Sequence, residues 1–165
     1  QGWLQEEGYL PCTPNGKPLT IHLAAMSGNA NQEPIIQNYI QQWKKEGLNV
    51  KLTGGRLIEF NSFYDKVQND DPSVDMFMGA WSLSSEPSPN DLYSKTAPMN
   101  YSRFVTKKNT QLLDEMDSQK AFNHQYRIDK FHEWQKYMDD EAYVLPVSNS
   151  YTITAVNKKL TGLLT

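Results

Sequence analysis

The sequence predicts an α/β fold built on a β-α-β-α-β core, with further helices and strands toward the C-terminus. Three apolar runs, residues 19–26, 48–53 and 74–81, have the length and composition of strands. The two segments between them, residues 31–45 and 57–68, carry apolar side chains at helical spacing. This alternation of strands and helices predicts a parallel sheet joined by right-handed crossovers.

The first strand, residues 19–26, follows a turn-forming cluster of proline, asparagine and glycine. It ends in a small polar loop that contains Ser27, Gly28 and Asn29. Asn31 is expected to cap the next helix, which a cationic last turn and a glycine bring to an end. These features predict the first β-α unit and place polar loop residues at the end of its strand.

The second helix, residues 57–68, follows a glycine pair and has an apolar side. That side comprises Phe60, Phe63, Tyr64 and Val67.

The stretch of residues 74–92 is the one around which the predicted site is organised. It begins as an apolar run without clean alternation, which is typical of a strand buried on both faces. Serines and prolines follow, and then a helix start. Ligands of open α/β sheets bind outside the carboxyl ends of the strands. The candidate ligand-binding residues here are therefore Trp81, Ser82, Leu83, Ser84 and Glu86. A core strand followed by an ordinary loop is the alternative.

The second half of the chain is predicted to be mainly helical. A short helix near residues 91–95 precedes a looser segment, residues 96–103, which supplies Asn100, Tyr101 and Arg103 as further candidates. The remaining predicted elements are helices over residues 109–120 and 123–140 and strands over 142–147 and 151–156. Residues 1–8 have the pattern of the last turns of a helix ending at Gly8, which suggests a piece of a longer protein.

Composition excludes several classes of function. The chain has 165 residues and a net charge of −3 with no basic stripe, which disfavours nucleic-acid binding. Cys12 is the only cysteine, and the three histidines have no paired spacing, so neither an internal disulfide nor a metal site is expected. The sequence has no apolar segment long enough to span a membrane, and no signal peptide.

The enzyme motifs that we sought are also missing from the sequence. It contains no GxSxG, phosphate loop or GxGxxG pattern, and no cofactor is expected. Glu86 and Asp91 form a conceivable carboxylate pair for glycoside hydrolysis, but a loop glutamate and a helix-capping aspartate are the commoner explanation. Binding is favoured over catalysis, because serines and a tryptophan suit either a peptide or a sugar.

A series of short motifs, in order along nearly the whole chain, resembles the C-terminal part of the oligopeptide-binding proteins of ABC importers, extracellular solute-binding protein family 5. The motifs are EEGY at 6–9, PNGKPLTI at 14–21, WKKEGLNV at 43–50, the Phe77-to-Pro89 segment with Trp81, NYSRF at 100–104, LLDE at 112–115, residues 126–134 and the apolar strand 143–147.

The resemblance implies that residues 1–165 form a single α/β lobe, of the type II-like periplasmic-binding-protein class, from a much longer two-lobed protein. It also implies an oligopeptide ligand, delivery to the membrane permease of an ABC importer, no catalysis and a monomer. The intact protein is then expected on the outer face of a Gram-positive-like cell, held by a lipid anchor. An oligosaccharide or another small solute, such as nickel or a haem-like compound, is the alternative ligand, and a glycoside hydrolase is a remote alternative.

One position departs from the family pattern. Some members place an aspartate three residues after the tryptophan, where it pairs with the amino terminus of the peptide, and here Ser84 occupies that position. A serine lacks the charge for a strong ion pair. The departure predicts looser recognition of the peptide main chain, or capture of longer peptides. Glu86 is a candidate substitute for the missing charge, and a solvated Glu86 is the alternative.

Overall fold

The computed structural model describes residues 16, 18–83, 85–151, 155–157 and 159. The chain forms two compact units, Gln1–Arg103 and Phe104–Thr165, which we call the sheet unit and the helical unit. The helix predicted over residues 1–8 lies outside the described residues.

The sheet unit is built on a parallel sheet, which has three strands in the described part of the chain: β1 (Thr20–Ala25), β2 (Asn49–Leu52) and β3 (Met76–Met78). β1 lies in the middle, in the order β2-β1-β3. Leu23 of β1 is in register with a residue of each neighbouring strand. The predicted parallel β-α-β-α-β core is therefore confirmed.

Two helices connect these strands. α1 (Gln32–Lys45) joins β1 to β2, while a short 3-10 turn, η1 (Thr53–Gly55), and α2 (Phe60–Gln68) lie between β2 and β3. Gly47, with φ of 81°, follows α1 in the left-handed conformation that glycine favours. The predicted bounds of α1 hold, although the Asn31 side chain before it makes no capping hydrogen bond.

α2 begins later than the predicted start at residue 57. The carboxylate of Glu59 accepts hydrogen bonds from the backbone N–H groups of Asn61 and Ser62, at 2.9 and 3.2 Å. A carboxylate in this position satisfies N–H groups that have no partner within the helix, so it fixes the helix start.

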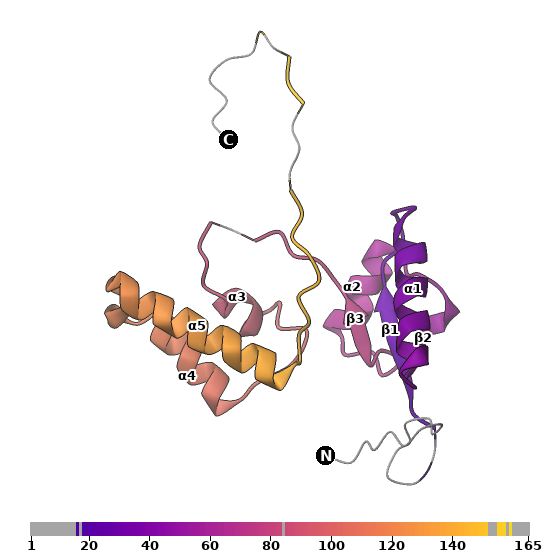
Figure 1. Ribbon diagram of the computed structural model, residues 1–165, viewed down its shortest axis with the longest axis horizontal. Coiled ribbons are helices and arrows are strands. Elements are labelled where there is room, and N and C mark those ends of the chain that lie inside the picture. The colour runs from indigo at the N-terminus through magenta and orange to yellow at the C-terminus, as the bar shows by residue number, and fades with distance from the viewer. Residues whose placement is uncertain (1–15, 17, 84, 152–154, 158, 160–165) are drawn as a thin grey trace. The chain divides into compact units, whose positions relative to one another are not determined.

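The two helices cover opposite faces of the sheet, as Figure 1 shows for β1 between α1 and α2. On one face, Leu23 and Ala25 of β1 pack in a buried cluster with Ile36 of α1. On the other face, Ala24 packs with Phe63 and the rest of a second cluster from α2. Side chains along a strand point alternately to its two faces, so one strand supports both clusters.

The third strand is shorter and less buried than predicted. Residues 74–81 were expected to form a strand buried on both faces, but β3 spans only Met76–Met78 and its residues are half-buried. The register of β1 with β3 ends at Ala25 and Met78. Beyond it, β1 continues only as an isolated bridge between Met26 and Ile58.

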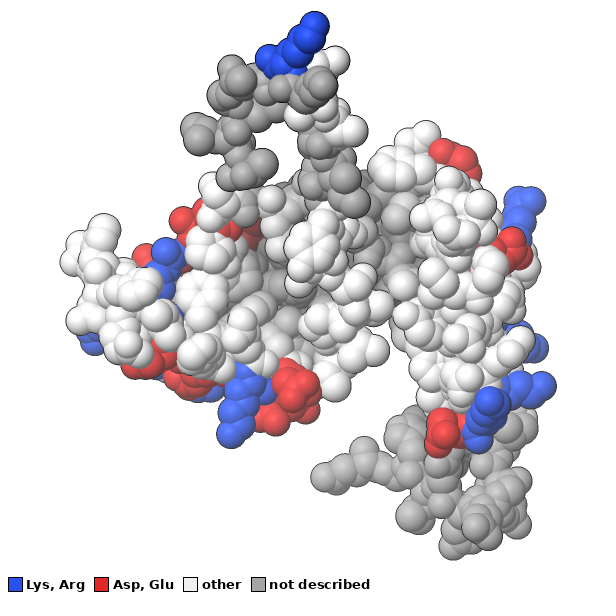
Figure 2. All heavy atoms as spheres, turned by 45° about the horizontal axis from the view of Figure 1, so that its top comes forward, with Lys and Arg blue, Asp and Glu red and all other residues white. Residues whose placement is uncertain are grey.

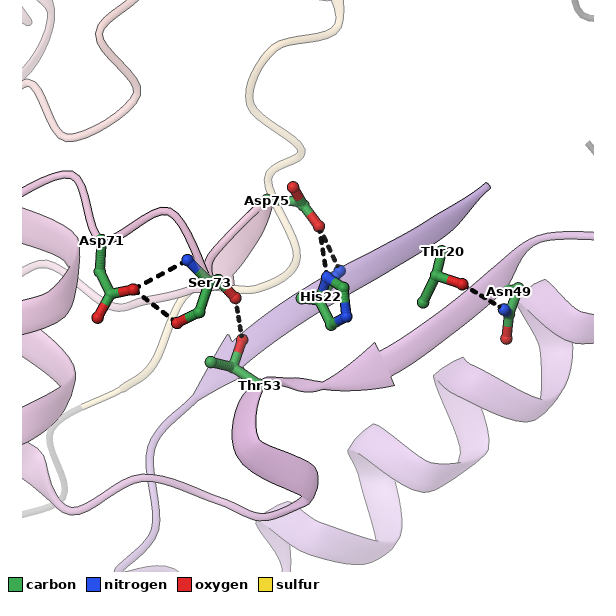
Figure 3. Close-up of polar contacts among 7 residues, drawn as sticks. All are labelled: Thr20, His22, Asn49, Thr53, Asp71, Ser73 and Asp75. Atoms are coloured by element: carbon green, nitrogen blue, oxygen red, sulfur yellow. Dashed lines mark hydrogen bonds and ion pairs between the residues drawn. The ribbon is translucent and has the colours of Figure 1, made fainter. Parts of the chain in front are cut away.

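Polar contacts link β1 and η1 to the segment before β3 (Figure 3). The Asp75 carboxylate accepts the backbone N–H of His22 at 2.8 Å and lies 2.9 Å from its ring Nδ1. The hydrogen bond from the backbone N–H of His22 is the main reason why the pKa of Asp75 lies below its usual range, and the contact with the ring adds to it. The Thr53 hydroxyl donates to the carbonyl of Ser73, which links η1 to the segment before β3.

The helical unit contains α4 (Lys107–Met116), a 3-10 turn η2 (Gln119–Phe122) and α5 (His124–Glu141). The predicted helices over 109–120 and 123–140 are thus confirmed with shifted ends. α4 starts earlier because the Thr106 hydroxyl accepts the N–H of Asn109, and α5 starts after Asn123, whose side chain accepts the N–H of Tyr126. In the described part of the chain, no helix is long and apolar enough to cross a membrane.

One face of α4 packs against α5. Leu112, Leu113 and Met116 of α4 are almost completely buried, and Trp134 of α5 is 9% exposed. The indole Nε1 of Trp134 donates to the buried Oδ1 of Asn109 at 3.0 Å. This bond satisfies two polar groups that water does not reach.

Ion pairs cover part of the α4–α5 surface. The ammonium of Lys130 lies 2.5 Å from Glu115 and 3.0 Å from Glu133, and these contacts raise the pKa of Lys130. Hydrogen bonds from Gln111 first and Lys130 second lower the pKa of Glu115. Hydrogen bonds from Lys108 first and Lys130 second lower the pKa of Glu133. Such partly exposed pairs add little stability. Charged side chains of both signs are mixed on the surface that Figure 2 shows, in keeping with the small net charge.

The predicted C-terminal strands do not form in the described residues. α5 ends at Ala142, which has a left-handed φ of 51°, and residues 143–151 contain no strand. Leu145 and Tyr151 are 78% and 94% exposed. An extended segment becomes a strand only when another strand satisfies its backbone groups. Of the strand predicted over 151–156, residues 152–154 lie outside the described part.

Replacement of the buried amide on α4 should weaken the helical unit. Asn109→Leu leaves the Trp134 N–H without its acceptor, and we expect a loss of about 1–3 kcal/mol in the free energy of unfolding. Urea unfolding followed by tryptophan fluorescence measures it. The control Lys107→Leu, at an exposed position of the same helix, should change stability by less than about 0.5 kcal/mol. Equal effects of the two substitutions would contradict the role of the Asn109 amide.

Asp71, in the loop between α2 and β3, should make the stability of the chain depend on pH in the acid range. A hydrogen bond from Lys66, at 2.5 Å, and two from Ser73 hold the pKa of Asp71 well below its usual range. A lowered folded-state pKa means that the stabilisation is complete above the ordinary pKa of about 4 and is lost as the pH falls below it. Melting temperatures measured from pH 6 to pH 2 should therefore fall less in Asp71→Asn than in the unsubstituted chain.

Asp139→Asn, at an exposed position of α5, serves as the control and should keep the full acid-dependent fall. If Asp71→Asn and the unsubstituted chain lose stability in parallel between pH 4 and pH 2, Asp71 makes no such contribution.

Candidate functional site

The carboxyl ends of the three parallel strands meet at one edge of the sheet, which is where open α/β sheets hold ligands. Ser27 follows β1, Arg56 follows β2 and η1, and Trp81 follows β3. The start of α2 lies at the same edge, because the N–H of Ser27 donates to the carbonyl of Ile58 at 2.7 Å. The predicted loops are thus brought to one side of the sheet unit.

The polar loop after β1 borders a hollow. Ser27 donates from both its N–H and its hydroxyl to Ile58, Gly28 has φ of 113°, and Asn29 accepts the N–H of Asn31. These bonds fix a tight turn that only glycine adopts without strain at its centre. The hollow measures about 450 Å³ and is open to solvent; its lining residues are Ser27, Gly28, Asn29, Ala30, Glu33, Arg56 and Leu57.

Trp81 and Tyr101, which were predicted separately, lie together. Their ring centroids are 5.2 Å apart with the planes at 40°, and Trp81 is 37% exposed. Tyr101 also meets Tyr64 and Phe77 edge-on, at 6.2 and 6.4 Å. Aromatic pairs in such tilted arrangements attract each other beyond their simple burial. The result is an aromatic surface with Trp81 at its exposed end.

The position of Tyr101 is set by α2 and by its own loop. The side-chain amide of Gln68 donates to the Tyr101 hydroxyl at 2.8 Å. The neighbouring Asn100 is 3% exposed; its amide donates to the carbonyl of Ser94 and accepts the hydroxyl of Ser102. The Asn100 side chain therefore holds the conformation of this loop through its hydrogen bonds.

Arg103 also stabilises this loop through hydrogen bonds. Its guanidinium donates to the Asp70 carboxylate at 2.8 Å and to the carbonyls of Gln68 and Asn100 at 2.7 and 3.1 Å. Arg103 was predicted as a candidate ligand-binding residue, and here its guanidinium pairs with the carboxylate of Asp70. These bonds link the end of α2 to the loop that carries Tyr101.

The segment after Trp81 is irregular and exposed. Ser82 is exposed, Leu83 is 72% exposed, and the Glu86 carboxylate accepts the N–H of Ser88 at 3.2 Å. Ser84 lies outside the described residues. This segment leads to α3 (Asn90–Tyr93), and it offers backbone groups and a large apolar side chain to a ligand.

The sequence did not predict the part that α2 takes in this site. Phe60 was predicted on the same side of the helix as Phe63, yet Phe60 is 58% exposed whereas Phe63 is fully buried. Gln68 was not singled out at all. Helical spacing shows which residues share a face, but it does not show which of them extend past the edge of the sheet.

The chemistry of this edge suits binding. It combines backbone N–H and carbonyl groups, hydroxyl and amide side chains, and an aromatic surface, which together match the main chain and the side chains of a peptide. Within the described residues, no three His, Cys, Asp or Glu side chains gather in a way that could hold a metal ion.

The sequence of this chain is similar to those of known oligopeptide-binding proteins. No protein-family model matches the sequence. The oligopeptide-binding protein OppA of Lactococcus lactis subsp. cremoris (strain SK11) is 44% identical over 151 residues, which is 90% of this chain and 25% of that protein. An OppA sequence of L. lactis subsp. cremoris is 42% identical over 89 residues, which is 54% of this chain and 72% of that sequence. The chain thus spans about a quarter of the length of the first of these relatives.

A solved structure agrees with the sequence comparison. Lactococcal OppA, complexed with an endogenous peptide in the closed conformation, superposes with a TM-score of 0.79 at 41% identity, over 86% of this chain and 27% of that one. The predicted periplasmic-binding-protein-like α/β fold is therefore confirmed. Together with the identity over most of the second OppA sequence, this agreement establishes that the chain belongs to the family of oligopeptide-binding proteins.

Proposed function

We propose that this chain is a ligand-binding part of an extracellular oligopeptide-binding protein, which delivers peptides to the permease of an ABC importer. The identity of 44% over 90% of the chain to an oligopeptide-binding protein carries this proposal. The solved relative that holds an endogenous peptide supports it. The chain matches only a quarter of the length of that oligopeptide-binding protein. The proposed function is therefore that of the complete receptor, to which this chain contributes one part.

The proposal extends to the organisation of the receptor. Residues 1–165 belong to a single lobe, which closes on the ligand together with a second lobe from outside this chain. Closure of hinged lobes excludes water and adds contacts on the far side of the ligand. The receptor is a monomer without a catalytic step or a cofactor, and a lipid anchor holds it at the outer surface of the cell.

In this receptor, Trp81 and Tyr101 supply an aromatic surface to the peptide. Ser82, Leu83, Ser84 and Glu86 lie along its main chain, while Ser27, Gly28 and Asn29 border the same edge. Asn100 and Arg103 hold the loop that carries Tyr101, as their hydrogen bonds to Ser94 and Asp70 support.

The nature of the ligand is tested by native mass spectrometry of the complete receptor purified without added peptide. A ladder of peptides of mixed sequence is expected, because main-chain recognition tolerates varied side chains. A single peptide species would instead indicate a dedicated signal receptor. Sugars or a metal complex in place of peptides would contradict the proposal.

Loss of the Trp81 ring should weaken peptide binding. In the complete receptor, Trp81→Ala is expected to raise the Kd for peptides about tenfold, equivalent to ~1.4 kcal/mol, because it removes the exposed end of the aromatic surface. Isothermal titration with one nonapeptide measures the change. Trp81→Phe keeps an aromatic ring and should raise the Kd less than about threefold. Unchanged affinity of Trp81→Ala for every peptide tried would remove Trp81 from the site.

A further inference from the structure

An exposed aromatic side chain stands in the first turn of α2. Phe60 is 58% exposed, and its ring centroid lies 4.9 Å from that of Tyr64 with the planes at 63°. Phe60 lies two positions after Ile58, which pairs with Met26 at the carboxyl edge of the sheet. The side chain is therefore an apolar group in water at the edge where the loops of the candidate site gather.

Phe60 continues the aromatic surface at the site. Tyr64 contacts Tyr101 at 6.2 Å, and Tyr101 contacts Trp81 at 5.2 Å. The four rings of Phe60, Tyr64, Tyr101 and Trp81 thus follow one another in a series, which we call the aromatic strip. Its end members are its most exposed parts, at 58% and 37%.

The middle rings of the strip are held in place by buried and half-buried neighbours. The fully buried Phe63 meets the Tyr64 ring edge-on at 5.2 Å, and Phe77 of β3 contacts both Phe63 and Tyr101. The hydrogen bond from Gln68 fixes the other side of Tyr101. Rings that are already fixed lose little conformational freedom when a ligand binds.

We propose that the aromatic strip is a side-chain subsite, which takes an aromatic side chain of the bound peptide at the Phe60 end. This inference rests on the proposed function and deepens it by naming a side-chain class that the receptor selects. An incoming ring can pack on Phe60 and Tyr64 in the tilted geometry that the four rings already have among themselves. A peptide ligand also needs pockets for alternate side chains beside its main-chain partners.

The experiment compares two nonapeptides on the complete receptor. One has nine alanines, and the other has a phenylalanine at its central position. A set of further peptides moves the phenylalanine along the sequence, so that the register with the strip need not be assumed. In at least one register, the unsubstituted receptor should bind the phenylalanine peptide more tightly than the alanine peptide, by about three- to tenfold.

Phe60→Ala should remove this preference. The Kd of the preferred phenylalanine peptide should rise to that of the alanine peptide, whose own Kd should change less than about twofold. Phe60→Trp, which keeps a ring, should retain the preference. Phe122→Ala is the matched control, because Phe122 is a 93% exposed phenylalanine in the helical unit and outside the strip.

Three other results overturn the inference. If Phe60→Ala weakens both peptides equally, or weakens neither, Phe60 does not select a side chain. A raised or lowered melting temperature without a change in preference would mean that Phe60 packs against protein and not ligand. If the unsubstituted receptor binds no nonapeptide at all, the proposed function fails first, and the two failures are thereby distinguished.

Discussion

The pairing of β1 with a strand on each side is the constraint on which the rest of the sheet unit depends. Because its side chains alternate, Leu23 and Ala25 support the cluster under α1, while Ala24 supports the cluster under α2. Parallel pairing on both sides also places the three carboxyl ends at one edge. The three loops that follow these strands are therefore gathered at one edge by how a single strand is paired.

The aromatic surface depends on a second, polar constraint. Asp70 and Arg103 both have left-handed backbone conformations, with φ of 52° and 53°, which are unfavourable for side chains of this size. The guanidinium of Arg103 compensates by joining the Asp70 carboxylate and the Gln68 carbonyl. The side chain of Gln68 in turn holds the hydroxyl of Tyr101. A strained pair of residues thus fixes the ring against which Trp81 lies.

Sequence patterns predicted β1 and α1 well, because an uninterrupted apolar run and a strong helical period each depend on local side chains alone. They predicted β3 too long and a strand over 142–147 that is absent, because a strand also needs a partner and the sequence does not show whether one is within reach. At the site, Trp81 and Tyr101 were both predicted, but their contact was not. The exposure of Phe60 was not predicted either, because periodicity gives the direction of a side chain and not its distance from the sheet edge.

A charged partner for the amino terminus of a peptide would fix the ligand at one end. By its resemblance to the family pattern, Ser84 takes the position of such an aspartate, and a serine offers only a neutral hydrogen bond. In the receptor that we propose, the end of the peptide would then be held loosely, and the choice among peptides would come from the side chains along it. An exposed strip of fixed rings can make that choice, because it attracts aromatic groups while the polar loops beside it accept the main chain of any sequence. Loose main-chain recognition and one selective subsite are thus compatible in a single receptor, and the aromatic strip is the part that would set its preference.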